Sequence, residues 1–232
     1  MDRLKKITIK YFVLFCIASI AVFALFQRFN IRDIAIRCGT RILPLEDRIH
    51  GTWLLEEYIC DTTLLSDATI LIGDSHLYYF QQYIPKNTNI INKAISGETT
   101  RGIISRDTLD LKNINNSNII LLAGYNDLKY RNVSQVCQNL DFLIHYYKEN
   151  HLIVLSLFPV NKKRTWINSQ IRQINSHLEG QCKRENITFI NLYDELLNES
   201  ATGLNTHYTR DGVHLNEKGY SILKKHLQYN IQ

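Results

Sequence analysis

The chain has 232 residues, of which 45% are hydrophobic and 21% charged, with ten glycines and three prolines. This composition excludes a disordered or collagen-like chain and is typical of one globular domain with an appendage. The net charge of +5 is unevenly divided: residues 1–30 hold five basic residues and one acidic residue, which leaves 22 basic and 21 acidic residues in the remainder. Such a nearly neutral body argues against nucleic-acid binding.

The N-terminal segment is predicted to anchor the chain in a membrane. Residues 11–26 are sixteen uncharged residues, preceded by Arg3, Lys5, Lys6 and Lys10. Counted from Ile7 to Phe29, the span is long enough to cross a bilayer as an uncleaved signal anchor. The basic flank would keep the N-terminus in the cytoplasm and the body outside it, in the periplasm if the host is bacterial. A signal peptide cleaved after Ala24 is the alternative, but bulky neighbours make that cleavage site a poor one.

The rest of the chain divides into a membrane-proximal segment and a main domain. We expect residues 1–30 to be the cytoplasmic stub and anchor, residues 31–66 the membrane-proximal segment, and residues 67–232 the main domain. Cys38 and Cys60 in the middle segment are either bridged or free, and both states fit an exported protein.

In the main domain, short apolar segments alternate with helical patterns. The predicted strands are residues 68–72, 89–95, 118–123, 152–158 and 187–192. Apolar residues at helical spacing predict two helices with one buried face each, at Val133, Val136, Leu140, Ile144 and Tyr147, and at Ile167, Ile171, Ile174, Leu178 and Cys182. A last helix is predicted from Glu217 to about Gln228, after Asn216 as the N-cap.

Alternation of strands and helices predicts an α/β fold with a parallel sheet that is covered on both faces. Such a sheet binds its ligand at the carboxyl ends of its strands. Polar residues stand at those places: residues 73–76 (GDSH), 96–98 (SGE) and 124–127 (GYND), with residues 211–214 (DGVH) in a late loop. We expect these four segments to converge at one edge of the sheet. Because neighbouring helices run roughly parallel, Cys137 and Cys182 should lie about 20 Å apart and should not form a disulfide.

The types of residue in these segments suit nucleophilic catalysis. Ser75 follows a buried strand in a tight turn, so its hydroxyl would be presented at the mouth of a site. A serine becomes a nucleophile when a histidine removes its proton, and a carboxylate usually orients that histidine. We therefore predict Ser75 as nucleophile, His214 as base and Asp211 as the group that orients the base.

Acyl transfer also requires donors for the developing oxyanion. The backbone N–H groups of Ser75 and Gly97 and the side-chain amide of Asn126 are the candidates. Gly97 allows close approach of the backbone because it has no Cβ.

Together these segments resemble the SGNH hydrolases, also called GDSL-type esterases and lipases. The order of the blocks is the same: a Gly-Asp-Ser block, a Gly, a Gly-x-Asn-Asp block and an Asp-x-x-His block. The similarity covers roughly residues 68–220, and His76 stands where the family's name-giving Leu would be. The resemblance implies a three-layer α/β/α sandwich with a flavodoxin-like five-stranded sheet and metal-independent ester hydrolysis. It implies the same roles for Ser75, Gly97, Asn126, Asp211 and His214.

These observations predict a membrane-anchored extracytoplasmic serine esterase that needs no cofactor. Its substrate would be an acyl ester, either an O-acetyl group on an envelope glycan or a lipid ester. Two alternatives remain open: an envelope O-acyltransferase with the same residues, and a catalytically silent binding subunit held at the membrane.

Other features have simpler interpretations. His207, Asp211 and His214 are compatible with a metal site, but catalysis accounts for two of them without a metal. We expect His76 to be a packed neighbour of the site. Tyr78, Tyr79 and Tyr83 are interpreted as core residues of an early helix, with an acyl pocket as the alternative.

Overall fold

The main domain is built on a parallel sheet of five strands. The computed structural model describes residues 68–86, 88–110 and 117–230, all within one compact unit. The strands are β1 (Thr69–Gly73), β2 (Ile90–Asn92), β3 (Asn118–Leu122), β4 (His151–Leu155) and β5 (Thr188–Ile190). They pair in the order β2-β1-β3-β4-β5, and every pair is parallel. This is the flavodoxin-like order, so the predicted sheet is confirmed.

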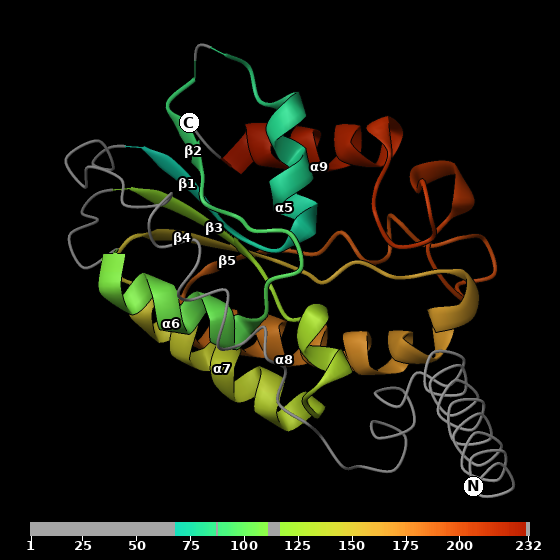
Figure 1. Ribbon diagram of the computed structural model, residues 1–232, viewed down its shortest axis with the longest axis horizontal. Helices are drawn as coiled ribbons and strands as arrows, with labels where there is room; N and C mark the ends of the chain where they lie inside the picture. Colours follow the sequence, from blue (N-terminus) through green and yellow to red (C-terminus); the bar gives the residue numbers. More distant parts are fainter. Residues whose placement is uncertain (1–67, 87, 111–116, 231–232) are drawn as a thin grey trace, which may run out of the picture. The chain divides into compact units, whose positions relative to one another are not determined.

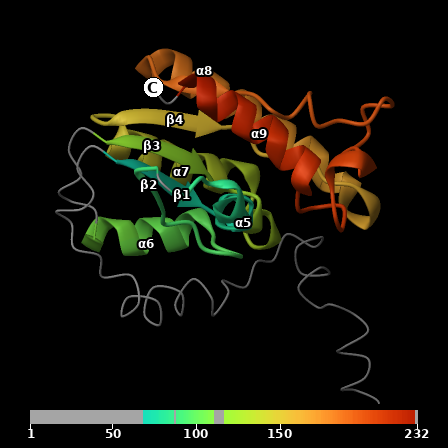
Figure 2. The same ribbon diagram turned by 90° about the horizontal axis from the view of Figure 1, so that it is seen from above.

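Helices cover both faces of this sheet. They are α5 (Ser75–Phe80), α6 (Thr100–Asp110), α7 (Val133–Tyr147), α8 (Asn168–Glu185) and α9 (Glu217–Asn230), with 3-10 helices η2 (Gln81–Tyr83), η3 (Asn126–Lys129), η4 (Lys162–Ile167) and η5 (Thr206–Tyr208). α5 and α9 lie on one face, and α6, α7 and α8 lie on the other (Figures 1 and 2). The strand order explains this division: β2 and β3 lie on opposite sides of β1, so right-handed crossovers to them pass over opposite faces.

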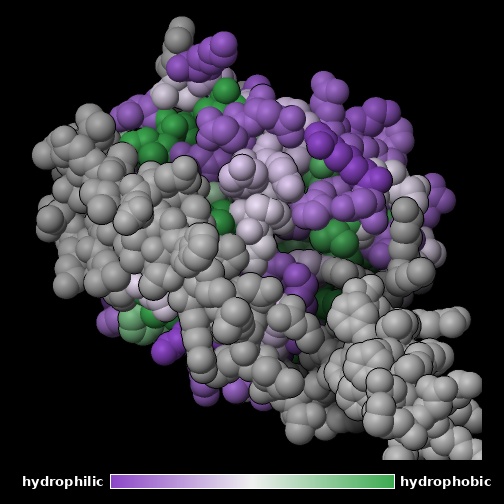
Figure 3. All heavy atoms as spheres, in the orientation of Figure 1, coloured by the Kyte–Doolittle hydropathy of each residue, from purple (hydrophilic) through white to green (hydrophobic). Residues whose placement is uncertain are grey.

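The core lies on both faces of the sheet and includes the helix faces that the sequence predicted. Every predicted apolar position of α7 and α8 is buried except Val133, which is half-buried. Cys137 and Cys182 belong to these buried faces and are free thiols, as expected. Outside the core, the described part of the face in Figure 3 presents mostly hydrophilic side chains, with smaller hydrophobic areas among them.

Strands β2 and β4 end earlier than predicted. After β2, the backbone N–H groups of Lys93 and Ile95 still donate to carbonyls of β1 (2.9 and 3.0 Å). The N–H of Ala94 between them donates to the side-chain oxygen Oδ1 of Asn92 (3.0 Å). Beyond β4, the side chain of Asn175 accepts from the Leu157 N–H (2.8 Å) and donates to the Leu157 carbonyl (2.9 Å). Buried apolar residues therefore continue past the end of β4 without forming a strand.

Three caps hold the helices at their N-termini. Asn216 precedes α9 as predicted and accepts from the Gly219 N–H at 3.1 Å. α7 is capped by Asn132, which forms a capping box with Gln135. At α6, the side chain of Asp127 accepts from the N–H of Thr100 (2.7 Å), the first residue of that helix.

The predicted anchor and membrane-proximal segment, residues 1–66, lie outside the described residues, as do Cys38 and Cys60. Among the helices of residues 68–230 that the structure describes, none is both long and apolar enough to cross a membrane.

Candidate active site

Ser75 is presented by the sharp connection from β1 to α5. Gly73 ends the strand, and a Cβ at this position would collide with the carbonyl oxygen of Leu122 in β3. Asp74 then caps α5 by accepting from the His76 N–H (3.0 Å). Ser75 is the first residue of this helix and is 6% exposed. The Gly-Asp-Ser sequence thus combines a close approach between strands, a helix cap and a serine at the carboxyl end of β1.

The structure brings Ser75, His214 and Asp211 into one hydrogen-bonded row. The distance from Ser75 Oγ to His214 Nε2 is 3.1 Å, and the distance from His214 Nδ1 to Asp211 Oδ2 is 2.8 Å. When Nδ1 carries the proton, it donates to Asp211, and Nε2 accepts from the serine hydroxyl. This is the arrangement that a nucleophile, its base and an orienting carboxylate require.

The loop of residues 209–215 fixes the His214–Asp211 pair before any substrate binds. Asp211 Oδ1 accepts from the backbone N–H groups of Val213 (2.9 Å) and His214 (2.8 Å), while Oδ2 contacts the imidazole. Burial raises the pKa of Asp211, but these hydrogen bonds outweigh burial and lower the pKa to about 2. The carboxylate is therefore ionised over the whole range in which a serine esterase would work.

The three residues predicted to donate to the oxyanion lie at one cavity, which Ser75, Gly97 and Asn126 all line. The Ser75 N–H lies at the start of α5, where a helix offers no internal acceptor. Gly97 has φ = +83° in a turn closed by a bond from the Glu98 N–H to the Ile95 carbonyl (3.2 Å), a bond that does not use the Gly97 N–H.

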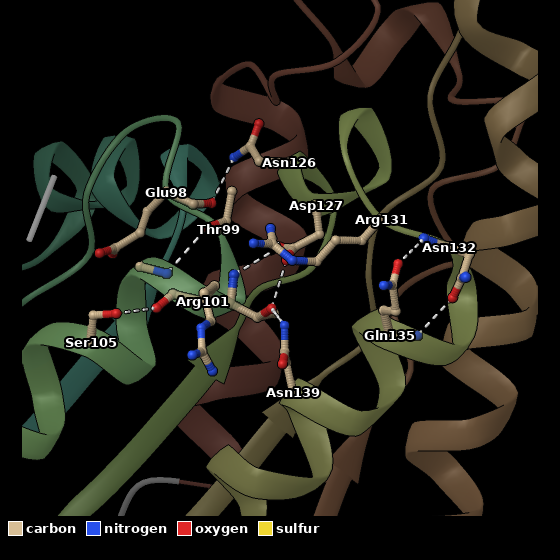
Figure 4. Close-up of polar contacts among 12 residues, drawn as sticks. Glu98, Thr99, Arg101, Ser105, Asn126, Asp127, Arg131, Asn132, Gln135 and Asn139 are labelled. Carbon is tan, nitrogen blue, oxygen red and sulfur yellow. Dashed lines mark hydrogen bonds and ion pairs between the residues drawn. The ribbon is translucent and has the colours of Figure 1, made fainter. Parts of the chain in front are cut away.

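Asn126 is held with its amide in a defined orientation. Its Nδ2 donates to the carbonyl oxygen of Glu98 (3.0 Å), and its Oδ1 accepts from Lys129 Nζ (3.2 Å). One N–H of the amide therefore remains for a ligand. Figure 4 shows Asn126 reaching across to the backbone of Glu98, which joins the second and third polar segments.

Asp127 ties the same two segments together beneath the site. Its carboxylate is completely buried and accepts from the N–H (2.7 Å) and the hydroxyl (2.6 Å) of Thr100 and from Arg131 Nη1 (3.2 Å). Asn139 of α7 also donates to the Thr100 hydroxyl (2.8 Å). In the Asn-Asp dipeptide, Asn126 thus lines the cavity, whereas Asp127 stabilises the scaffold beneath it.

The cavity has a volume of about 680 Å³, and its lining also includes Ser96, Tyr125, Lys129, Asn161 and Val213. Ser96, Tyr125 and Val213 belong to the predicted polar segments, whereas Lys129 and Asn161 were not predicted. Lys129 follows Asn126 by three residues, the spacing of one turn of η3. This spacing could have indicated that the two side chains lie close together. Asn161 comes from the loop after β4, and its N–H donates to the Gly212 carbonyl (2.8 Å), a contact that only the tertiary structure reveals.

Two buried ionisable groups flank Ser75 in the sequence. Burial raises the pKa of Asp74 to about 7, against the lowering effect of its bond from the His76 N–H. Burial lowers the pKa of His76 to about 3, and the nearby His214 acts in the same direction. The His76 ring packs between Phe158 (centroids 4.9 Å apart) and His214 (5.8 Å), so His76 is the packed neighbour that we expected.

Tyr78 and Tyr79 are not core residues, contrary to the prediction. Their side chains are 45% and 38% exposed, because they lie on the side of the short helix α5 that faces away from the sheet. The Tyr79 ring meets the His214 ring edge-on, with centroids 5.4 Å apart. Tyr83 is half-buried and packs on Tyr220 of α9 (4.8 Å), so only this tyrosine of the three joins the core.

Within the described parts of the chain, no group of three His, Cys, Asp or Glu side chains could hold a metal ion. Of the three residues considered for such a site, His207 instead contacts Lys218 through its Nε2 (2.9 Å).

Comparison with known proteins decides the family. The family model of the GDSL-like lipases and acylhydrolases matches residues 73–222, a range that contains all four polar segments. The chain belongs to the GDSL-like lipase/acylhydrolase family. It is therefore an enzyme of the ester-hydrolase type. A search among curated protein sequences finds no match.

Solved structures of GDSL hydrolases share its fold. A GDSL-like lipase from Bacteroides thetaiotaomicron aligns with a TM-score of 0.67 and 21% identity, over 79% of this chain and 97% of that one. A lipase/acylhydrolase from Enterococcus faecalis aligns with a TM-score of 0.56 and 19% identity, over 71% and 95%. An acetyl-xylooligosaccharide esterase from Geobacillus stearmophilus aligns with a TM-score of 0.56 and 17% identity, over 71% and 94%. At these identities the alignments establish the fold of this GDSL hydrolase.

Proposed function

We propose that the protein is a serine esterase in which Ser75 attacks the carbonyl carbon of a carboxylic ester. The observation that carries this proposal is the row of contacts from Ser75 Oγ through His214 to Asp211, at 3.1 and 2.8 Å. This row lies in a cavity that also contains Gly97 and Asn126.

The reaction would proceed in two halves. As Ser75 Oγ bonds to the carbonyl carbon, its proton moves to His214 Nε2, and the N–H groups of Ser75, Gly97 and Asn126 stabilise the oxyanion. The bond to the leaving alkoxide then breaks, and His214 returns the proton to release an alcohol. Water repeats the sequence on the acyl-enzyme, with His214 as base, and releases the acid and free Ser75.

We also propose that the esterase works outside the cytoplasm, on the membrane that holds its N-terminus. The support is the uncharged run of residues 11–26 and the basic residues before it. A substrate in the cell envelope follows from that location: O-acetyl groups on glycans and lipid esters are the two classes considered. The fold similarity to an acetyl-xylooligosaccharide esterase fits the first class.

The decisive test is the hydrolysis of p-nitrophenyl acetate by the purified full chain in detergent. We expect Ser75→Ala to reduce kcat by a factor of about 10³ or more, because no other group in the cavity replaces the nucleophile. Ser105→Ala is the matched control: that hydroxyl is exposed on α6 and only donates to the Arg101 carbonyl (2.9 Å). Equal activity of Ser75→Ala and wild type would refute the assignment.

A further inference from the structure

A second cavity lies near His214, which its lining residue Tyr79 contacts edge-on. It has a volume of about 400 Å³ and is lined by Tyr78, Tyr79, Gln81, Gln82, Asn92, Ala94 and Arg210. We call it the tyrosine cavity. Two of its residues contact the catalytic histidine: the centroid of the Tyr79 ring lies 5.4 Å from that of the His214 ring, and the Arg210 N–H donates to the His214 carbonyl (3.0 Å). The tyrosine cavity therefore lies beside the catalytic histidine.

We propose that the tyrosine cavity binds a sugar ring, and that the substrate is consequently an O-acylated glycan. This inference rests on the proposed esterase function and names its substrate class. The observation that supports it is the presence of exposed aromatic rings and amide side chains together in the tyrosine cavity.

The aromatic part of the tyrosine cavity consists of Tyr78 and Tyr79. Their rings are nearly perpendicular (76°), with centroids 5.3 Å apart, and both are more than one-third exposed. The face of an aromatic ring is electron-rich. A sugar ring presents several weakly positive C–H bonds on one face, so it can stack on such a surface. Apart from these two, the large hydrophobic side chains exposed in the described parts of the chain, Phe142 and Trp166, do not line either cavity.

The polar part of the tyrosine cavity suits hydroxyl groups. Gln81 and Gln82 carry primary amides, which both donate and accept hydrogen bonds, as sugar hydroxyls do. Gln82 Nε2 donates to the Tyr79 carbonyl (3.1 Å), and Arg210 Nη2 donates to Tyr83 Oη (3.4 Å), so both side chains are oriented by the protein. Each retains further hydrogen-bonding groups for a ligand.

The same polar groups disfavour a lipid in the tyrosine cavity. A hydrocarbon chain would remove water from Gln81, Gln82 and Arg210 without replacing the lost hydrogen bonds, and each unsatisfied polar group is costly. A sugar ring covers the two tyrosines and replaces those hydrogen bonds. The lining therefore favours a glycan over an acyl chain.

The test compares esters with and without a sugar in the full chain and in Tyr78→Ala. The substrates are p-nitrophenyl acetate, O-acetylated xylo-oligosaccharides, O-acetylated cello-oligosaccharides and a monoacylglycerol. Tyr78 is chosen because Tyr79 contacts His214. We expect Tyr78→Ala to raise KM for an acetylated oligosaccharide about five- to tenfold, the loss of one aromatic contact, and to leave p-nitrophenyl acetate hydrolysis unchanged. Gln81→Ala should act in the same direction.

Phe142→Ala is the matched control, because Phe142 is 46% exposed and stacks on Tyr146 of the same helix, α7, outside both cavities. It should change none of the four activities. Failure to hydrolyse either oligosaccharide, or a KM for them that Tyr78→Ala leaves unchanged, would overturn the sugar subsite while Ser75-dependent p-nitrophenyl acetate hydrolysis still supports the esterase. A larger effect of Tyr78→Ala on the monoacylglycerol would assign the cavity to an acyl chain. Absence of Ser75-dependent turnover would overturn the esterase itself.

Discussion

Asp211 uses its two carboxylate oxygens for different purposes. Oδ1 accepts two backbone N–H groups and thereby shapes the loop, whereas Oδ2 faces the imidazole of His214. The two purposes can be separated by mutation, because an asparagine side chain keeps one acceptor oxygen but loses the charge.

We predict that Asp211→Asn preserves the loop and reduces kcat for p-nitrophenyl acetate by a factor of roughly 10²–10⁴, with little change in KM. The Asn Oδ1 can still accept from Val213 and His214, but its NH2 group meets His214 Nδ1 and favours the wrong tautomer. Asp141→Asn is the control, since Asp141 contacts His177 at 2.7 Å on the surface of α7 and α8. Steady-state kinetics of the two variants check the prediction, and equal losses in both would contradict it.

The buried carboxyl of Asp74 makes stability depend on pH. Burial raises its pKa from an ordinary value of 3.8 to about 7 in the folded protein, and Oδ2 has no hydrogen-bond partner among the residues that the structure describes. Between these values the unfolded chain releases the proton while the folded chain retains it. The free energy of unfolding contributed by this group is therefore intact below pH 3.8 and falls as pH rises toward 7.

We predict that Asp74→Asn raises the free energy of unfolding by roughly 1–2 kcal/mol at pH 8 and gives no gain at pH 4. Asparagine keeps the acceptor that caps α5, and it does not ionise. Urea unfolding of wild type and variant at both pH values provides the measurement. A difference independent of pH would show that Asp74 does not titrate in this way.

At the scale of elements, the junction of β1 with β3 leaves no room for a side chain at Gly73. The last ladder positions pair Gly73 with Leu122, whose carbonyl occupies the place of a Cβ. The same contact lets the Asp74 N–H donate to the Leu122 carbonyl (3.2 Å), so the strand passes directly into the α5 cap. The position of Ser75 depends on this close approach.

We predict that Gly73→Ala lowers the free energy of unfolding by about 3 kcal/mol or more, because backbone rather than a flexible side chain must move. Gly180→Ala is the opposite case: Gly180 lies in the middle of α8, and its Cβ would meet only the end of Arg184 at 3.5 Å. That change should stabilise the protein by about 0.5–1 kcal/mol. Chemical denaturation distinguishes them, and a tolerated Gly73→Ala would contradict the steric argument.

At the scale of the molecule, the site lies where the order of the strands in the sheet reverses. β2 and β3 leave β1 on opposite sides, so the segments after all three strands open at one edge between the helical layers. The loop after η5 reaches the same edge and delivers His214 to Ser75. Ligand sites of open α/β sheets occupy this switch point for the same reason.

We predict that the full chain expressed in bacteria stays in the membrane after a carbonate wash, with residues 67–232 accessible to protease from the periplasmic side. The basic residues before the uncharged run should hold the N-terminus inside, and replacing Lys5, Lys6 and Lys10 by Glu should reduce this orientation. Fractionation and protease digestion of spheroplasts check both statements. Release of the chain by carbonate would disprove the anchor, and a mature chain that begins after Ala24 would establish cleavage.

The sequence by itself determined the strand-and-helix alternation, the buried faces of α7 and α8, and the four polar segments at strand ends. These features depend on local patterns. The spacing of apolar residues predicts strands and helix faces, and Gly, Asp and Asn mark turns because the backbone geometry of turns favours them. Only the tertiary structure decided which residues meet. The end of β4, the Asp127–Thr100 bond and the place of Asn161 in the cavity depend on partners far away in the chain. The exposure of Tyr78 and Tyr79 depends on which side of α5 packs on the sheet. Burial and long-range hydrogen bonds outweigh local propensity at these places, so a local pattern cannot predict them.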